Sequence, residues 1–353
     1  DNELGRKNSV KSNSFGVMLD QSFTDYFNLG LFYYQTKFAV PFAATDEPFE
    51  LTGRNFKFYS ASYQFIYDDL FISGEFAYNG TSVASINALQ LALSEDVIFS
   101  TSVRSYPRNY TNLFSQGFGE SSTTQNEVGF YSGISWDSPI GDFDFYFDQF
   151  KFPYANFTNP LPSVGNEFMG KYEVSVSDIS EISLRYKQEN KELSVIQENK
   201  ETLSKRLKRQ ARASLELNPG SNIRLRTRLD YVNVAYEHKF TPEEGFLIFE
   251  DIRITLLQKI DLYGRFIFFN TDSYESRVYE FENDLRGRLT NKSLFDEGLR
   301  WYVFIKYEFL PDFELSIKYS ETYKPGVTSI SSGYRMIPDN LNHQLSLQLD
   351  AEF

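Results

Sequence analysis

Strict alternation of apolar and polar side chains is the feature of this sequence that most constrains its fold. In the segment 345–353, Leu, Leu, Leu, Ala and Phe occupy every second position, with Ser, Gln, Asp and Glu between them. Successive side chains of a β-strand point to opposite faces, so this segment presents one apolar and one polar face. The same rhythm recurs in segments 143–148, 182–187, 223–230, 301–309 and 313–320. The chain is therefore predicted to be all-β.

The medium against which the apolar faces lie is predicted to be lipid. No apolar run approaches the about 18 residues that a membrane-spanning helix needs. Segments of about ten alternating residues are instead typical of strands in a transmembrane β-barrel. The 35 Phe and 24 Tyr fit the aromatic girdles of such barrels at the two membrane interfaces. The sequence thus favours an outer-membrane barrel of a Gram-negative bacterium over a soluble β-sandwich.

Connections between the predicted strands alternate between short and long. Short turns are predicted at 68–69, 94–96, 138–141, 218–220 and 310–312. Longer polar loops are predicted at 40–55, 108–125, 153–167, 188–203 and 323–343. Outer-membrane barrels have short periplasmic turns and long extracellular loops, so the C-terminus is predicted to be periplasmic.

The predicted fold class is a closed antiparallel outer-membrane β-barrel, formed as a single domain by residues 1–353. About 17 candidate strands can be counted; since closed bacterial barrels have an even number, we predict about 18, with about 14 to 16 as the alternative. The short turn after the strand 14–23 requires a strand before it, which is supplied partly by residues 1–12 or belongs to preceding sequence. The segment 277–292 fits either a strand or a loop.

No motif for catalysis or for metal binding is found. The chain has no Cys, and its two His, His238 and His343, are isolated near predicted loops. A nucleophile–base pair and a zinc site are therefore not predicted. No Gly-rich phosphate loop precedes a helix. We expect a protein that is not an enzyme and that has no cofactor.

A basic stripe is the feature most informative about function. It consists of alternate residues in three consecutive predicted strands: Arg185, Lys187, Arg206, Lys208, Arg212, Arg224, Arg226 and Arg228. Consecutive antiparallel strands are neighbours, so the stripe is predicted to line one wall of the lumen, in a chain of net charge −13. An uncompensated stripe attracts anions. The alternative is a structural ladder paired with inward acids, for which the candidates are Asp144, Asp148, Glu173, Glu216 and Asp230.

The terminal residue Phe353 ends an alternating strand. This arrangement resembles the C-terminal signature of bacterial outer-membrane proteins and implies an assembly signal that the barrel-assembly machinery reads during insertion. The expected partners are this machinery, outer-membrane lipid and lipopolysaccharide. A stable complex with other outer-membrane or periplasmic proteins is a further expectation if the barrel serves a larger assembly.

Several local motifs point to a family. They are SYPRNY at 105–110, FGESS at 118–122, QNEVGFYSG at 125–133, DSYESRVY at 272–279 and YEFENDL at 279–285. From roughly residue 60 to the C-terminus, the chain resembles the barrel region of Bacteroidota outer-membrane proteins labelled helix-hairpin-helix domain-containing. The resemblance implies an N-terminal periplasmic module, and a first strand, that precede the sequence given. Nucleic acid would be a partner only through that absent module.

Three functions fit these observations. The first is a porin-like channel with a basic lumen wall, active in transport. The second is a structural or accessory subunit of a larger outer-membrane assembly, secretion or uptake machine. The third, a port for DNA uptake, is supported by the family resemblance alone.

Overall fold

The computed structural model describes residues 6–43, 49–156, 159–197 and 199–352. Within these residues the fold is all-β, with 19 strands and one short 3-10 helix. No helix in this part of the chain is long and apolar enough to cross a membrane. Backbone hydrogen bonds join 17 of the described strands into one sheet, and β15 and β16 form a separate two-stranded sheet.

The strands are bounded as follows. The first nine are β1 (Ser12–Thr24), β2 (Phe27–Phe42), β3 (Gly53–Tyr67), β4 (Leu70–Tyr78), β5 (Val83–Ser94), β6 (Val97–Tyr106), β7 (Glu127–Ser138), β8 (Gly141–Phe152) and β9 (Ser163–Ser177). The remaining elements are β10 (Ser180–Gln197), β11 (Lys200–Gly220), β12 (Ile223–Tyr236), β13 (Glu243–Leu256), β14 (Ile260–Thr271), β15 (Val278–Glu282), β16 (Thr290–Leu294), β17 (Glu297–Leu310), β18 (Phe313–Tyr323), η1 (Gly333–Arg335) and β19 (Leu341–Ala351).

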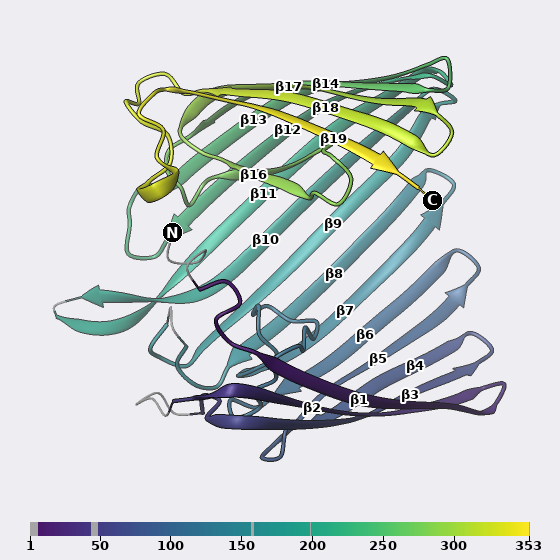
Figure 1. Ribbon diagram of the computed structural model, residues 1–353, viewed down its shortest axis with the longest axis vertical. Helices are drawn as coiled ribbons and strands as arrows, with labels where there is room; N and C mark the ends of the chain where they lie inside the picture. The colour runs from purple at the N-terminus through teal and green to yellow at the C-terminus, as the bar shows by residue number, and fades with distance from the viewer. Residues whose placement is uncertain (1–5, 44–48, 157–158, 198, 353) are drawn as a thin grey trace. The chain divides into compact units, whose positions relative to one another are not determined.

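Strands of the large sheet pair antiparallel with their neighbours in the sequence, as in β2 with β3 and β12 with β13 (Figure 1). The exception is β14, which pairs with β17 because β15 and β16 lie in the connection between them. Four of the five predicted short turns are confirmed: β3 ends at Tyr67 and β4 begins at Leu70, for example. The turn predicted at 218–220 lies at 221–222 instead, because β11 runs to Gly220. Period-two alternation therefore located the strands correctly.

One predicted loop is wrong. The segment 188–203 was expected to be a loop, but β10 runs to Gln197 and β11 begins at Lys200. Glu, Gln, Asn and Lys dominate this segment, so neither face of the strand pair is apolar. An antiparallel ladder is held by backbone hydrogen bonds, which form regardless of side-chain polarity. The alternation of apolar and polar side chains is absent from this segment, although the backbone pairing of β10 with β11 continues through it.

The large sheet has 17 described strands, against about 18 predicted for a closed barrel. Among the described residues β1 pairs with β2 and β19 pairs with β18, and the sheet is not closed. Residues 6–11 contain no strand, and residues 1–5 lie outside the described part of the chain. The segment 277–292, for which the sequence fits either a strand or a loop, forms most of the hairpin β15–β16. Closure of the barrel stays a prediction.

The chain is organised as two compact units. The first comprises the described residues of 1–137, 144–168 and 190–205, and the second those of 138–143, 169–189 and 206–353.

The two faces of the sheet in the second unit differ in character. On β12, β13 and β14, Leu229, Phe246 and Phe266 point to one face and are exposed. Arg228 and Arg265 alternate with such residues, point to the opposite face and are buried. We call these the apolar face and the charged face. Exposed large hydrophobic side chains in a contiguous surface mark contact with lipid or with another protein.

Strand β19 offers a direct test of this assignment. Leu347 lies on the apolar face beside Ile317 and is 67% exposed, whereas Gln348 lies beside Ser316 on the other face. If the apolar face contacts lipid, Leu347→Arg should lower the free energy of unfolding by about 2–4 kcal/mol near the midplane. Gln348→Arg should have a small effect. The measurement is equilibrium unfolding in lipid vesicles, and equal losses at the two positions would contradict the assignment.

Candidate functional site: a charged face covered by a hairpin

The hairpin β15–β16 packs against the charged face of the second unit. Val278 pairs with Leu294 at one end of the hairpin, and Glu282 pairs with Thr290 at the other. Val278 and Leu294 are buried in a core cluster with side chains of the charged face of β12, β13 and β14: Val232, Val234, Leu247, Phe249, Ile267 and Phe269. Burial of each such side chain contributes about 1.5–3 kcal/mol. Apolar packing therefore fixes one end of the hairpin to the sheet.

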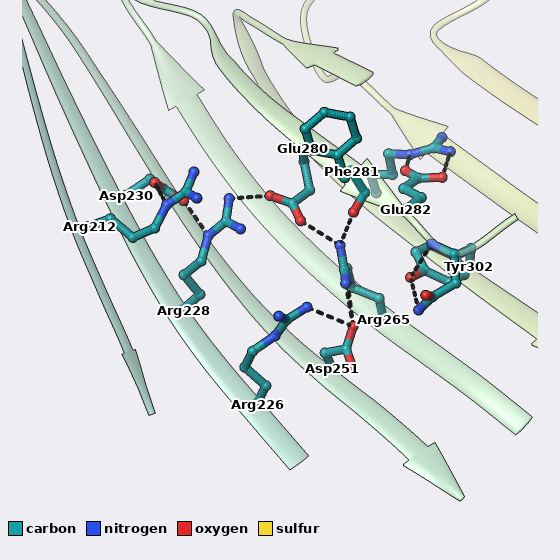
Figure 2. Close-up of polar contacts among 12 residues, drawn as sticks. Arg212, Arg226, Arg228, Asp230, Asp251, Arg265, Glu280, Phe281, Glu282 and Tyr302 are labelled. Atoms are coloured by element: carbon teal, nitrogen blue, oxygen red, sulfur yellow. Dashed lines mark hydrogen bonds and ion pairs between the residues drawn. The ribbon is translucent and has the colours of Figure 1, made fainter. Parts of the chain in front are cut away.

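Glu280 is the first ionic link between hairpin and sheet. Its carboxylate accepts hydrogen bonds from Arg228 of β12 and from Nη1 of Arg265 of β14, the latter at 2.6 Å. Arg265 Nη1 also donates to the backbone carbonyl of Phe281 at 2.7 Å. Figure 2 shows Glu280 between the two guanidinium groups. The centre of the hairpin is thus held by charge-assisted hydrogen bonds, which are about twice as strong as neutral ones.

Glu282 is the second link. It accepts hydrogen bonds from Nε and Nη2 of Arg300 on β17, the latter at 2.8 Å, and from Nζ of Lys318 on β18 at 3.0 Å. Lys318 Nζ also donates to the carbonyl of Asn283 at 2.7 Å. All three charged side chains are nearly fully buried. A buried charge is tolerated only when it is paired and hydrogen-bonded, so this link depends on all its members.

Asp251 on β13 is shared by three arginines. Arg265 donates to its Oδ2 from Nε at 2.8 Å, whereas Arg224 and Arg226 only approach its oxygens to 3.8 Å. The Nε atoms of Arg224 and Arg226 have no hydrogen-bond partner among the described residues. Their side chains are 30% and 29% exposed. These two guanidinium groups are therefore incompletely paired and partly open to solvent.

Aromatic rings support the guanidinium groups. The ring of Phe249 lies under three of them, with Arg265 at 4.3 Å, Arg228 at 4.8 Å and Arg226 at 5.4 Å from its centroid. Such cation–π contacts stabilise the charged guanidinium groups where they are removed from water. In this cluster five arginines face three acids: Arg212, Arg224, Arg226, Arg228 and Arg265 against Asp230, Asp251 and Glu280. A fourth acid, Glu216, lies in register beside Arg226 on the same face, so the cluster carries an excess of one positive charge.

A second cationic group lies where the hairpin approaches β17, β18 and β19. It surrounds a small polar cavity of about 10 Å³ whose charged lining residues are Arg288, Lys292, Arg300, Lys318, Glu282 and Asp284. Lys292 makes no hydrogen bond or ion pair with the described residues. Four cations against two acids again leave a positive excess.

The pKa values of the hairpin acids follow from these contacts. Burial raises the pKa of Glu280 above its ordinary value, although Arg228 and Arg265 favour the charged form. Burial opposes ionisation of Glu282 as well, but Arg300 and Lys318 outweigh it and hold its pKa below the ordinary value. Burial and the neighbouring charge of Arg300 lower the pKa of Lys292.

The structure places the predicted basic stripe on three consecutive strands, as expected. Arg185 and Lys187 lie on β10 and are half-buried, and the others follow on β11 and β12. The register separates the stripe along the strands, because Arg206 lies beside Tyr236 at one end of β12 and Arg224 lies near the other end. Arg206 pairs with Glu189, and Lys208 Nζ donates to the Glu275 carbonyl at 3.4 Å. The stripe is thus not one cluster.

The acids predicted as its partners have various contacts. Asp230 pairs with Arg212 at 2.6 Å and with Arg228 at 2.7 Å. The others bind elsewhere: Asp144 to Ser135, Asp148 to Arg104, Glu173 to Lys171 and Glu216 to Asn218. The sequence reasoning missed Asp251, Arg265 and Glu280. Asp251 and Arg265 follow the alternation of their strands and could have been found, whereas Glu280 lies in the segment whose structure was left open.

Comparisons with known proteins give weak similarities. No protein-family model matches the sequence, and no similar sequence is found among curated proteins. The chain is similar to outer-membrane expressed OmpT of Vibrio cholerae, with 10% identity, coverage of 86% of this chain and 89% of that one, and a TM-score of 0.40.

Two further solved structures are similar to the chain. OccK10 (OpdN) of Pseudomonas aeruginosa has 10% identity, with 96% of this chain and 94% of that one covered and a TM-score of 0.42. OccAB3 of Acinetobacter baumannii has 9% identity, with 96% and 91% covered and a TM-score of 0.43. Similarities at this level do not assign the chain to the families of these proteins.

The ionic link at Glu282 predicts a detachable hairpin. Glu282→Gln leaves Arg300 and Lys318 buried without a full countercharge, which costs about 3–5 kcal/mol. An isolated hairpin has little stability of its own, so residues 278–294 should exchange their amide hydrogens faster. Glu352→Gln is the matched control, because Glu352 also pairs with the hairpin segment, through Arg286, but both side chains are exposed. Equal protection of the hairpin in both variants would contradict the link.

The same link predicts a dependence on pH. Because the pKa of Glu282 is lowered, its contribution is present above the ordinary pKa of about 4.3 and is lost as pH falls through the lower folded value. Glu280 acts in the opposite direction: because its pKa is raised, its protonation as the pH falls favours the folded state. Hairpin protection in the unmodified chain should therefore persist at pH 5 and weaken progressively as the pH falls below about 4.3.

Proposed function

We propose that the chain forms an outer-membrane β-barrel that acts as a porin-like channel with a preference for anions, and that it is not an enzyme. In this proposal the sheet closes in lipid by pairing of β19 with β1. An open sheet edge in lipid leaves backbone groups unsatisfied, at a cost of several kcal/mol each. The C-terminus lies in the periplasm, on the side of the short turns.

The apolar face supports the placement in lipid. In the first unit a similar row is formed by Leu19, Leu31 and Phe76. These side chains are exposed and lie on neighbouring strands, with Ala61 between the last two. In the second unit Val303, Tyr319 and Leu345 lie side by side on β17, β18 and β19. Rows of this kind are the outward surface expected of a transmembrane barrel.

The incomplete pairing of Arg224 and Arg226 is the observation that carries the anion preference. Both side chains are partly exposed and lie 3.8 Å from the shared Asp251, too far for a hydrogen bond, in a cluster with one excess positive charge. Rings of arginine or lysine select anions in pores. The hairpin β15–β16 covers the same face. In the closed barrel that we propose, it narrows the lumen beside these arginines.

Planar-bilayer recording under a salt gradient tests the anion preference. The reversal potential of the wild type should indicate anions. Arg224→Gln with Arg226→Gln removes two positive charges, more than the excess in the cluster, so the preference for anions should be lost. Arg228 is left in place because it holds the hairpin through Glu280.

Arg209→Gln is the matched control for the single variant Arg226→Gln. Arg209 pairs in register with Asn233, on the opposite face from Arg226, so the same charge is removed outside the passage. The control should leave the reversal potential unchanged. Cation preference in the wild type, or an equal shift in the control, would contradict the proposal.

A structural subunit of a larger outer-membrane assembly is the second candidate. Glu250 favours it: this exposed carboxylate lies near the middle of β13 on the apolar face and accepts a hydrogen bond from Thr227 at 2.9 Å. A carboxylate facing lipid at that depth is costly, whereas a partner protein could satisfy it. Absence of conductance together with a larger mass in mild detergent would favour this candidate.

Assembly is the last element of the proposal. Phe353, the predicted assembly signal, lies outside the described residues. We retain it as the site read by the barrel-assembly machinery, because β19 alternates strictly up to its end. Lipid and lipopolysaccharide are the proposed surroundings of the apolar face.

A further inference from the structure

The first unit contains an aromatic pocket beneath the connection between β6 and β7. Residues 107–126 of this connection fold over β2, β3, β4 and β5 and leave a space of about 280 Å³ that opens to solvent. Seven aromatic residues line it: Phe32, Tyr34, Phe58, Tyr59, Tyr106, Tyr110 and Phe114. This volume is just below the range of about 300–1,000 Å³ typical of small-molecule sites, so the pocket suits a small ligand.

Hydrogen bonds and stacking fix the walls of this pocket. Tyr34 stacks on Phe58 with centroids 4.6 Å apart and an angle of 22°. The Tyr34 hydroxyl donates to Asn112, and Nδ2 of Asn112 donates to the Tyr110 hydroxyl at 3.0 Å. The Tyr106 hydroxyl donates to the carbonyl of Phe118 at 2.8 Å. The pocket is therefore preformed by contacts between the strands and the connection.

The same connection is anchored by a buried ion pair. The backbone N–H groups of Glu120 and Ser121 donate to the Glu127 carboxylate at 3.0 Å. Glu127 pairs with Arg104 at 2.6 Å, and both side chains are fully buried. Arg104 in turn pairs with Asp148 at 2.8 Å. Arg104, Glu127 and Asp148 therefore pair with one another and do not line the pocket.

Glu75 is the single charged residue among the described residues that line the pocket. It is exposed and makes no hydrogen bond or ion pair with the described residues. An anion would be repelled by this carboxylate. A cation would gain both the carboxylate and the aromatic faces, which attract ammonium groups through their quadrupoles.

We propose that this pocket binds an organic cation, a molecule that carries an ammonium group next to apolar carbon. Glu75 supplies the countercharge. Phe32, Tyr34 and Phe114 supply ring surface for the apolar carbon and the cationic head. The site is independent of the proposed anion preference, because that preference depends on residues of the second unit alone.

Choline and its neutral isostere 3,3-dimethyl-1-butanol test the proposal. The full chain is held in a polyoxyethylene detergent, whose headgroup is uncharged and contains no sugar, and binding is measured by ligand-observed NMR. Choline should bind at least about tenfold tighter than the isostere. Glu75→Gln should weaken choline binding by about tenfold and leave the isostere unchanged. Phe114→Leu should weaken both ligands.

Glu95→Gln is the control for the charge change, because Glu95 lies in the short turn between β5 and β6 and outside the pocket lining. It should bind choline like the wild type. Circular dichroism checks that each variant keeps its strand content. The proposal is overturned if choline does not bind, if it binds no tighter than the isostere, or if Glu75→Gln leaves its affinity unchanged. Tighter binding of methyl glucoside than of choline would identify a sugar site instead and equally overturn it.

Discussion

Arg265 joins the sheet of the second unit to the hairpin that covers it. Its guanidinium donates to Asp251 on the neighbouring strand, to Glu280 on the hairpin and to the carbonyl of Phe281. Burial of a charge is tolerated only when its donors are satisfied, so each of these partners fixes the position of the next. Arg228 reaches the same Glu280 from β12, which makes one hairpin carboxylate the meeting point of two strands. The hairpin therefore lies where the arginines of the sheet require an acid.

This arrangement leaves a positive charge on a face where most of the clustered arginines are paired. Asp251 and Glu280 accept hydrogen bonds from the central arginines, whereas Arg224 and Arg226 lie 3.8 Å from Asp251, beyond hydrogen-bond distance. The sequence offered two alternatives, an anion-attracting stripe and a paired structural ladder. The structure contains both arrangements, at different positions along the strands. Arg212 and Arg228 belong to the ladder through Asp230, and Arg224 and Arg226 retain the charge that an anion would meet.

Most of the strands could be predicted from the sequence because alternation is a local property. The period of two located β12, β17, β18 and β19, and it placed the arginines of the stripe on one face. It failed at 188–203, where both faces are polar and the backbone ladder continues without an alternating signal. The hairpin could not be predicted, since Val278 and Leu294 find their partners only once β12, β13 and β14 lie side by side. Pairing of Glu280 with Arg228, about 50 residues away, likewise follows from three-dimensional register, which composition does not contain.

The central claim is that one face of this sheet meets lipid and the other meets water and the hairpin. Because the chain has no Cys, single cysteines carrying a spin label can be introduced one at a time from 224 to 229 on β12. In lipid vesicles, accessibility to oxygen should peak at 225, 227 and 229. Accessibility to a water-soluble nickel chelate should peak at 224 and 226 and fall at 228, which the hairpin covers. A uniform aqueous accessibility along the strand, without a period of two, would contradict the claim.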